Sequence, residues 1–418
     1  MQLTEILVIS GLIETLILFS YAVRYYLFSL TVLFFRNSGK EEPTISDHVV
    51  GQFISIMLPV YNEPNVVDRL LKSCTSFDYP NYEVLALDDS TDETTAKLEK
   101  WKAHPRVKVI HRNSRKGWKG GALNEGLEHL DTRSTHVLIL DADFVPPKDL
   151  LQRFLAKYCD GGTVAVQGYQ NHDLNAEENW LTKGVRVLYS VDNMVELNAK
   201  NKLKLFNYLT GSVFMIKTEI LKRFKFEDDL TEDWNLALRL YEAGYKIIYD
   251  PTLKASGECP QTLFRLFKQN LRWAEGHTRN VRRHLFNILS SKFITRREKL
   301  EFLLLGSIYF NAIFVVGLTS LGIFLIPYFS LVLANPFAVL TWLLALIGIP
   351  STAIAALVAL SLEGAKKDFG KIPNALFLGY ISTPIMAYGA LKGIFTDNGH
   401  FQRTYKTGRI ARPNRPNG

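Results

Sequence analysis

Residues 136–143 read HVLILDAD, an apolar run with the length of one strand that ends in two carboxylates, Asp141 and Asp143. Two earlier runs, residues 54–60 (ISIMLPV) and 82–87 (YEVLAL), are also short, branched and apolar, and they also end in polar residues. Segments with helical spacing of apolar residues separate the runs. Alternating strands and helices predict an α/β fold, a Rossmann-like, mostly parallel sheet with helices on both faces.

The polar residues at the strand ends are the first candidates for a binding site, because such sheets bind ligands at the carboxyl ends of their strands. Residues 107–111 add a further strand, and helices are expected at residues 92–102 and 121–130. The strand-end residues are Tyr61, Asn62 and Glu63, then Asp88 and Asp89, then Asp141 and Asp143. We expect them to meet at one edge of the sheet.

The pair Asp141 and Asp143 predicts a metal site. Carboxylates at positions i and i+2 after a buried strand direct their oxygens toward one point, where Mg²⁺ or Mn²⁺ is held between the protein and a diphosphate. An isolated D-x-D more often belongs to a surface turn. The other acidic strand ends in the same domain favour the metal site here.

Residues 115–124 (RKGWKGGALN) place paired glycines and lysines before a helix. Gly120 and Gly121 allow close approach of the backbone to a ligand, and Lys116 or Lys119 supplies positive charge for phosphate oxygens at the helix start. The pattern is neither a Walker motif nor G-x-G-x-x-G, and taken alone it also fits a surface turn.

Thr231, Glu232 and Asp233 begin a further helix (TEDWNLALRLYEAGYK). One interpretation is structural, with Thr231 as the cap and the acids in the first turn. The other is catalytic, because a helix start can expose a carboxylate to a cleft, where a general base would lie.

Apolar residues are concentrated outside this α/β region. Hydrophobic residues make up 47% of the 418-residue chain, and they gather at residues 6–35, 302–362 and, more weakly, 372–395. The first segment is long enough to span a membrane, and it lacks the basic flank and the cleavage site of a signal peptide. Its charged residues, Glu14 and Arg24, are interpreted as snorkelling toward headgroups or as lining a polar path.

The second apolar segment is too long for one span. It is interrupted around Pro327 and Pro336 and fits two spans, residues 302–326 and 337–362. The third segment carries prolines and polar residues, and we expect it to be an interfacial or re-entrant helix rather than a full crossing.

The net charge of +8 is concentrated beside the apolar segments, in residues 277–299 and in the tail after Asp397. This distribution is typical of the cytoplasmic face of a membrane protein, with anionic lipid headgroups as counterions, and nucleic acid is not expected as a partner. It places the N-terminus outside and the polar domain and tail in the cytosol. The odd number and wide spacing of Cys74, Cys159 and Cys259 suggest neither a disulfide framework nor a zinc site.

Taken in order, the motifs resemble the inverting family 2 glycosyltransferases, specifically the cellulose-synthase-like membrane branch. Further matches are QNLRW at residues 269–273 and, in the tail, HFQRTYKTG at residues 400–408. The tail is similar to the family's gating loop, F-x-V-T-x-K, with Arg403 in place of the usual valine. The motifs that carry the resemblance are PVYNE (59–63), LDDSTDET (87–94), KGGALN (119–124), DADF (141–144), TED (231–233) and Q-x-x-R-W (269–273).

The resemblance implies a fold of A type and a nucleotide-sugar donor. Donor-binding residues would be Tyr61, Glu63, Asp88, Asp89, Lys119, Asp141 and Arg272, with Mg²⁺ or Mn²⁺ at Asp141 and Asp143. Asp233, beside Glu232, would be the catalytic base. Gln269 and Trp273 would bind the acceptor, and Phe401, Thr404 and Lys406 would act in gating.

With this resemblance the chain divides into six regions. They are an N-terminal transmembrane helix (1–40), a cytosolic catalytic domain (51–275), a basic interfacial region (276–300), two transmembrane helices (301–362), an interfacial or re-entrant helix (363–399) and a basic cytosolic tail (400–418). The expected location is a plasma membrane or its equivalent.

The expected activity is sugar transfer from a nucleotide-sugar, with UDP-glucose favoured, to a growing β-linked polysaccharide. One alternative is transfer to a lipid, as in ceramide glucosyltransferases, and another is an inactive nucleotide-sugar-binding partner. Three membrane spans are few for a polysaccharide channel in one chain, so a homo-oligomer is a further arrangement to consider.

Overall fold

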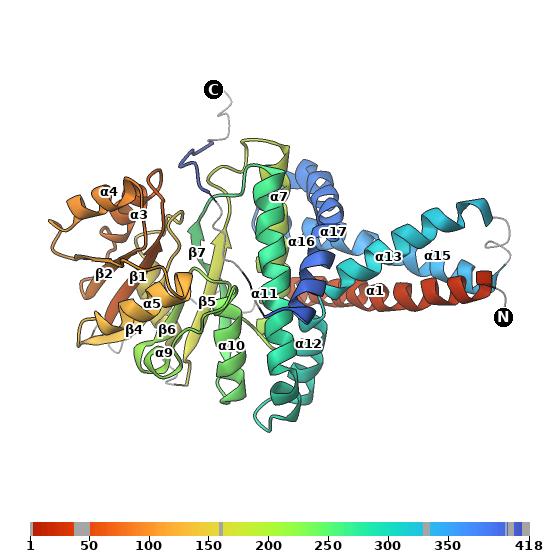
Figure 1. The fold of residues 1–418 in the computed structure, drawn as a ribbon, viewed down its shortest axis with the longest axis horizontal. Helices are drawn as coiled ribbons and strands as arrows, with labels where there is room; N and C mark the ends of the chain where they lie inside the picture. The colour runs from red at the N-terminus through yellow and green to blue at the C-terminus, as the bar shows by residue number, and fades with distance from the viewer. Residues whose placement is uncertain are drawn as a thin grey trace.

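The computed structural model describes residues 3–36, 51–158, 162–328, 335–397, 399 and 405–411. An α/β domain forms one end of the molecule, and long helices extend from it at the other end, where the N-terminus lies (Figure 1). A layer of helices that run across the long axis lies between the two parts.

The centre of the α/β domain is a seven-stranded sheet with the order β3-β2-β1-β4-β6-β5-β7. Strand β1 pairs in parallel with β2 and β4, whereas β6 runs antiparallel to β4 and β5. The predicted α/β fold with a mostly parallel sheet is therefore confirmed. The strands are β1 (Phe53–Val60), β2 (Tyr82–Asp88), β3 (Val107–His111), β4 (Ser134–Ile139), β5 (Ala165–Asn171), β6 (Phe214–Lys217) and β7 (Ile247–Ser256).

Helices pack on both faces of the sheet because side chains alternate along each strand. In β1, Ile54, Ile56 and Leu58 belong to the core under α3, α4 and α6, while Met57 belongs to the core under α5, α9 and α10. These helices are α3 (Val67–Cys74), α4 (Thr94–Trp101), α5 (Trp118–Glu128), α6 (Leu150–Leu155) with the short η1 (Ala156–Tyr158), α9 (Thr218–Phe224) and α10 (Glu232–Glu242). Both faces are thus covered, which leaves the strand ends as the place for a site.

Two long helical stretches form the layer next to the sheet. One consists of α7 (Trp180–Ser190), the π-helical η2 (Val191–Leu197) and α8 (Asn198–Lys202). The other is α11 (Leu263–Ser290), a single helix. Helix α11 continues unbroken through residue 276, where a basic interfacial region was predicted to begin, and the basic residues up to 290 form its second half. The interfacial position of this half stays a prediction.

The remaining helices are α1 (Leu3–Phe34), α12 (Arg296–Gly306), α13 (Phe310–Leu325), η3 (Ile326–Tyr328), α15 (Pro336–Gly348), α16 (Pro350–Leu362), η4 (Lys366–Lys371) and α17 (Ile372–Phe395). Within the described residues, two segments are long and apolar enough to span a membrane, Glu5–Phe34 and Pro336–Leu362. The pair α12 and α13 would add a third, but it is bent by 51°. The span predicted to begin at residue 302 therefore begins inside α12.

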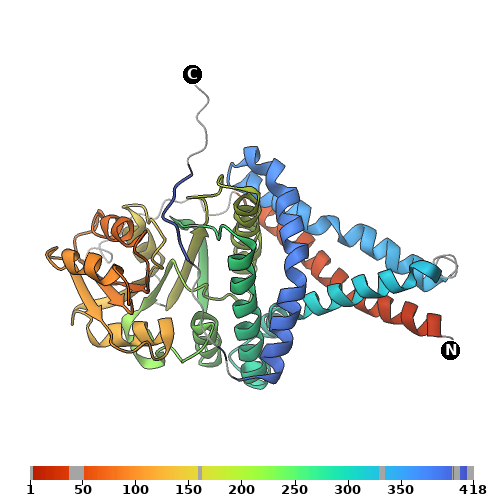
Figure 2. The ribbon, with the colours of Figure 1, turned by 45° about the horizontal axis from the view of Figure 1, so that its top comes forward.

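Helix α17 lies beside α11 in both views, across the direction of α1 (Figure 2). Its small residues allow this close packing, since a Cβ added to Gly393 would lie 2.5 Å from the Glu275 carbonyl oxygen. The interfacial position predicted for this helix stays a prediction.

Arg24 of α1 does not snorkel to the headgroups. Its side chain is buried and forms ion pairs with Glu196 of η2 at 3.1 Å and with Glu301 of α12 at 2.6 Å. Lys200 lies 2.9 Å from Glu196 and 3.5 Å from Glu301. This buried network joins the N-terminal helix to the layer that supports the site, and it replaces the interpretation of Arg24 as a surface anchor.

Candidate active site

A cavity of about 540 Å³ opens where β1, β2 and β4 end. It brings together residues separated by more than 300 positions in the chain. The predicted residues that line it are Tyr61, Glu63, Asp89, Lys119, Asp141, Asp143, Glu232, Asp233, Gln269, Arg272, Trp273 and Lys406.

Asp88 is the exception among the described candidates. Its carboxylate is fully buried and accepts hydrogen bonds from the Ser90 amide at 2.9 Å and the Thr95 hydroxyl at 2.7 Å. His111 Nδ1 lies 2.8 Å from the same carboxylate. Asp88 thus organises the loop after β2, because successive residues point to opposite sides of a strand and only Asp89 faces the cavity. Asp88 therefore does not line the cavity, and its role in donor binding stays a prediction.

Two arginines that were given no role from the sequence contact the predicted site residues. Arg112 donates two hydrogen bonds to Asp89, from Nε and Nη2, each 2.6 Å long. The Arg115 guanidinium stacks over the Tyr61 ring, 3.4 Å from its centroid. Single arginines after a strand give no signal in the sequence, so both roles were missed.

Lysines neutralise both carboxylates of the D-x-D pair. Lys119 Nζ lies 2.7 Å from Asp141 Oδ1, and Lys406 Nζ lies 2.7 Å from Asp143 Oδ2. Burial acts to raise the pKa of Asp143, but the Lys406 ammonium outweighs it and holds this pKa below its ordinary value. The two ammonium groups therefore lie next to the carboxylate oxygens that a bound cation would contact.

The pair fits a cation that also binds a substrate. No group of three or more His, Cys, Asp or Glu side chains suited to a metal occurs among the described residues. The protein would thus supply the two carboxylates, and Mg²⁺ in such sites takes its other ligands from phosphates and water.

The predicted base lies at the start of α10. Asp233 is partly buried and lines the cavity, and its Oδ1 accepts a hydrogen bond from the Trp234 amide at 2.8 Å. Burial, then the neighbouring Glu232 carboxylate, raises the pKa of Asp233 to about 7, against the lowering effect of Lys119. Gly211 leaves space beside it, since an added Cβ would lie 3.0 Å from Asp233 Oδ2. A carboxylate with this pKa can accept a proton near neutral pH.

Lys119 connects the D-x-D pair to the start of α10. Besides Asp141, it contacts Glu232 at 3.4 Å and donates a hydrogen bond to the Gly211 carbonyl at 2.6 Å. Its position follows from α5, which begins at Trp118 after Gly117 in the left-handed region with φ of 72°. The lysine therefore holds a fixed positive charge between the two acidic groups.

The Q-x-x-R-W residues come from α11. Gln269, Arg272 and Trp273 all line the cavity, and Arg272 Nη1 donates a hydrogen bond to the Leu230 carbonyl at 3.0 Å. Tyr189 of α7 meets the Trp273 ring edge to face, with centroids 6.5 Å apart. These contacts place the motif on the side of the cavity opposite the strand ends.

The inner part of the cavity is lined by residues that the sequence did not indicate. They come from α7 and η2, from the loop after α8, from α11, from α17, and from the end of α12 with the break that follows it. They include Tyr189, Asp192, Asn193, Tyr208, His277, Leu305, Ile308, Tyr309 and Met386. No spacing in the sequence distinguishes these residues from ordinary helix residues. Their position at the cavity follows from the packing of the helices.

The described part of the tail, residues 405–411, reaches the cavity through Lys406. The amides of Thr407 and Gly408 donate to Glu258 Oε2 at 3.1 and 3.4 Å, and Glu258 is fully buried. Asn65 donates to the Tyr405 hydroxyl at 2.9 Å. Phe401 and Thr404 lie outside the described residues.

This fold and this group of acidic side chains define a glycosyltransferase domain. Residues 55–227 match the family model described as "Glycosyl transferase family 2". The domain is thus a family 2 glycosyltransferase domain, and the predicted resemblance is confirmed.

Similar proteins include "Glucomannan 4-beta-mannosyltransferase 1" of Oryza sativa subsp. japonica, 28% identical over 261 residues, with 59% of this chain and 50% of that protein covered. "Glucomannan 4-beta-mannosyltransferase 9" of Arabidopsis thaliana is 28% identical over 291 residues, with 65% and 55% covered. The chain therefore spans about half the length of the curated relatives it matches.

A mannosyltransferase from Pyrobaculum calidifontis, PcManGT, solved in complex with GDP-Man and Mn²⁺, shares the fold. Its TM-score is 0.58 at 20% sequence identity, and the match covers 84% of this chain and 99% of that chain.

Proposed function

We propose that the protein is an inverting glycosyltransferase of the membrane, moving a sugar from a nucleoside-diphosphate-sugar to a hydroxyl group of a β-linked glycan. The observation that carries this proposal is the cavity that holds Asp233 together with Lys119, Asp141 and Asp143. The same cavity therefore provides a base and a group of charged side chains for binding a diphosphate.

Asp233 acts as the base. An acceptor hydroxyl is a poor nucleophile until its proton is removed. The hydroxyl oxygen attacks the anomeric carbon of the donor sugar while the hydroxyl proton passes to the Asp233 carboxylate. The bond between the anomeric carbon and the diphosphate breaks in the same step. A pKa of about 7 suits this transfer at neutral pH. Displacement in one step inverts the anomeric centre, and no second catalytic carboxylate is needed.

Positive charge within the cavity stabilises the leaving group. The Lys119 ammonium and the Arg272 guanidinium line the cavity with Asp141 and Asp143, where charge develops on the departing nucleoside diphosphate. Mg²⁺ or Mn²⁺ held by the two aspartates would neutralise part of that charge when bound. Asp89, with Tyr61 under Arg115, forms the outer wall suited to the nucleoside.

Mannose is the sugar to test first. The relatives are named as mannosyltransferases, and the structural neighbour was solved with GDP-Man. These names support GDP-mannose over the UDP-glucose favoured from the sequence.

A lipid-linked acceptor is the second candidate. The inner end of the cavity reaches Leu305 and Ile308 at the bend between α12 and α13, and Met386 of α17. Apolar lining residues beside helices of membrane-spanning length favour an acceptor that arrives from the bilayer. The catalytic positions are all filled, which argues against an inactive nucleotide-sugar-binding partner.

The test is a donor and acceptor panel on the full-length protein in nanodiscs. Radiolabelled GDP-mannose, UDP-glucose and UDP-N-acetylglucosamine are each supplied with Mn²⁺, with β-linked mannan oligosaccharides or with a lipid extract as the acceptor. We expect mannosyl transfer that stops in chelator and returns when Mn²⁺ is added. Label in chains supports the glycan product, and label that extracts with lipid supports the second candidate. The absence of transfer from every donor would contradict the proposal.

A further inference from the structure

One face of α11 holds the segment of chain that leads into the catalytic helix. An added Cβ at Gly276 would lie 2.8 Å from the Thr231 side chain, so the two backbones approach closely here. One turn earlier in α11, Arg272 donates to the Leu230 carbonyl. Residues 229–231 therefore lie directly on α11, immediately before Glu232 and Asp233.

A buried carboxylate and a buried amide organise this contact. Asp229 Oδ1 accepts hydrogen bonds from the Thr231 amide at 3.0 Å and from Asn280 Nδ2 at 2.9 Å. Asn280 Nδ2 also lies 3.1 Å from the Thr231 hydroxyl, and Asn280 Oδ1 accepts a hydrogen bond from Asn235 Nδ2 at 3.0 Å. Asn280 thus contacts Thr231, two positions before Asp233, and Asn235, two positions after it.

This arrangement takes the place of an ordinary helix cap. Thr231 precedes α10 with φ of −134° and ψ of 67°, and its side chain makes no capping hydrogen bond. Instead, the Thr231 backbone amide donates a hydrogen bond to Asp229 Oδ1. The direction in which α10 leaves this point, and with it the direction of the Asp233 side chain, is fixed by contacts with α11.

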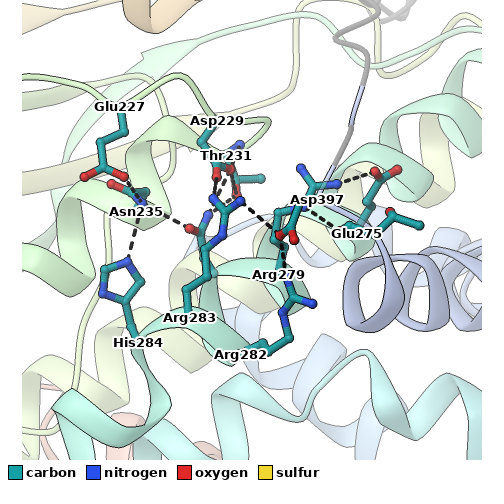
Figure 3. A network of polar contacts seen from close by, with 12 residues as sticks. Glu227, Asp229, Thr231, Asn235, Glu275, Arg279, Arg282, Arg283, His284 and Asp397 are labelled. Carbon is teal, nitrogen blue, oxygen red and sulfur yellow. Dashed lines mark hydrogen bonds and ion pairs between the residues drawn. The ribbon is translucent and has the colours of Figure 1, made fainter.

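The same network extends to the end of α17 (Figure 3). Arg283 bridges Asp229 Oδ2 at 3.3 Å and Asp397 Oδ1 at 3.1 Å, and Arg282 also pairs with Asp397. Arg279 Nε donates to the Thr396 carbonyl at 3.1 Å. The contact between α10 and α11 is therefore braced from its outer side by the residues that follow α17.

We propose that Asp229 and Asn280 are positioning residues that set the direction of the Asp233 carboxylate toward the acceptor. The proposal rests on the proposed function, and neither residue touches the reacting groups in this role. Their effect is on the geometry of proton transfer. A change in this pair should therefore alter turnover and leave donor affinity in place.

The test changes each of the two groups in turn. Asn280→Asp places two carboxylates face to face, and Asp229→Asn places an amide where the Asp229 carboxylate accepts hydrogen bonds from both the Thr231 amide and Asn280. Asn280→Ser is the conservative variant, because it keeps a shorter uncharged group that can donate to Asp229. Asn287→Asp is the matched control, because Asn287 is exposed on the same helix.

We expect Asn280→Asp and Asp229→Asn each to lower kcat by roughly ten- to a hundredfold, as for a misplaced catalytic group, with donor Kd unchanged. The pH at which kcat falls on the acid side should also shift, because the surroundings of Asp233 change. Asn280→Ser should retain more of kcat than Asn280→Asp and keep the wild-type pH profile, and the control should match the wild type. If Asn280→Asp does not fold, Asp229→Asn is compared with Asn280→Ser in its place.

Single variants that are less thermostable but keep wild-type kcat per folded molecule would overturn the inference. A loss of kcat in Asn280→Ser as large as that in Asn280→Asp would do the same. A wild-type protein that transfers no sugar would instead contradict the proposed function, so the two failures are distinguishable.

Discussion

At the scale of single residues, the surroundings of Asp233 determine its chemistry. An ordinary aspartate is too weak a base to accept a proton from a sugar hydroxyl efficiently. Burial and the adjacent Glu232 carboxylate raise the pKa of Asp233 to about 7, while Lys119 limits the increase. The same lysine contacts Asp141, so it links the base to the D-x-D pair.

The pH dependence of turnover should follow this carboxylate. The base must be deprotonated to act, and a group with a raised pKa becomes protonated as the pH falls through that value. We therefore expect kcat to fall as the pH decreases through about 7. Turnover measured at saturating donor between pH 5 and pH 9, a range set to span this titration, checks the expectation. A profile that is flat across it would mean that a group other than Asp233 accepts the proton.

Lys406 should compete with a divalent cation for Asp143. Its ammonium lies 2.7 Å from Asp143 Oδ2, the same carboxylate that would bind a metal. We expect Lys406→Ala to tighten Mn²⁺ binding in the absence of donor, measured by electron paramagnetic resonance of free Mn²⁺. Lys148→Ala is the control, because Lys148 is exposed close to the same strand end. Equal Mn²⁺ affinity in wild type and Lys406→Ala would show that the lysine does not block the site.

At the scale of elements, the network around Arg24 joins α1 to η2 and α12. Removing one partner of a buried ion pair leaves the other charges without compensation, which typically costs about 3–5 kcal/mol. Lys200 stays close to both glutamates and should reduce that cost. Arg24→Gln should therefore lower the midpoint of thermal unfolding in detergent, and Arg36→Gln, at an exposed position after the same helix, should not. Equal midpoints would mean that the network does not stabilise the junction.

The strands and the helices between them were predictable because their signals are local. Alternation in β1 and the carboxylates after β4 are visible in short windows of sequence. The extent of α11 was not predictable, since its basic second half resembles a separate interfacial segment. Tyr189 and Asp192 reach the cavity only through the packing of α7 and η2, so no local pattern could reveal them.

At the scale of the whole molecule, we expect the α/β domain and the tail to lie on the cytosolic side. Thiol labelling of Cys74 and Cys259 cannot show on which side of the membrane the domain lies, because both side chains are buried and burial raises the pKa of Cys259 to about 12. Cysteines introduced at exposed positions are needed instead, namely Glu5→Cys, Lys148→Cys and Arg409→Cys.

An impermeant maleimide should label the cysteine at position 5 in intact cells. It should label those at positions 148 and 409 only after the membrane is permeabilised, if α17 is interfacial as expected. Labelling at position 409 but not at position 148 in intact cells would mean that α17 crosses the membrane.

The central claim is that Asp233 is the base of a sugar transfer, and Asp233→Asn tests it most directly. The variant keeps the size of the side chain and a hydrogen-bonding oxygen, but it cannot accept the proton. Turnover and donor Kd are measured on the same folded protein in nanodiscs. The account predicts a loss of turnover of about a hundred- to ten-thousandfold with donor Kd unchanged. If Asp233 only stabilises α10 through the helix dipole, its replacement would lower the free energy of unfolding by about 0.3–1 kcal/mol. Turnover would then stay near the wild-type value, which would contradict the role of Asp233 as the base.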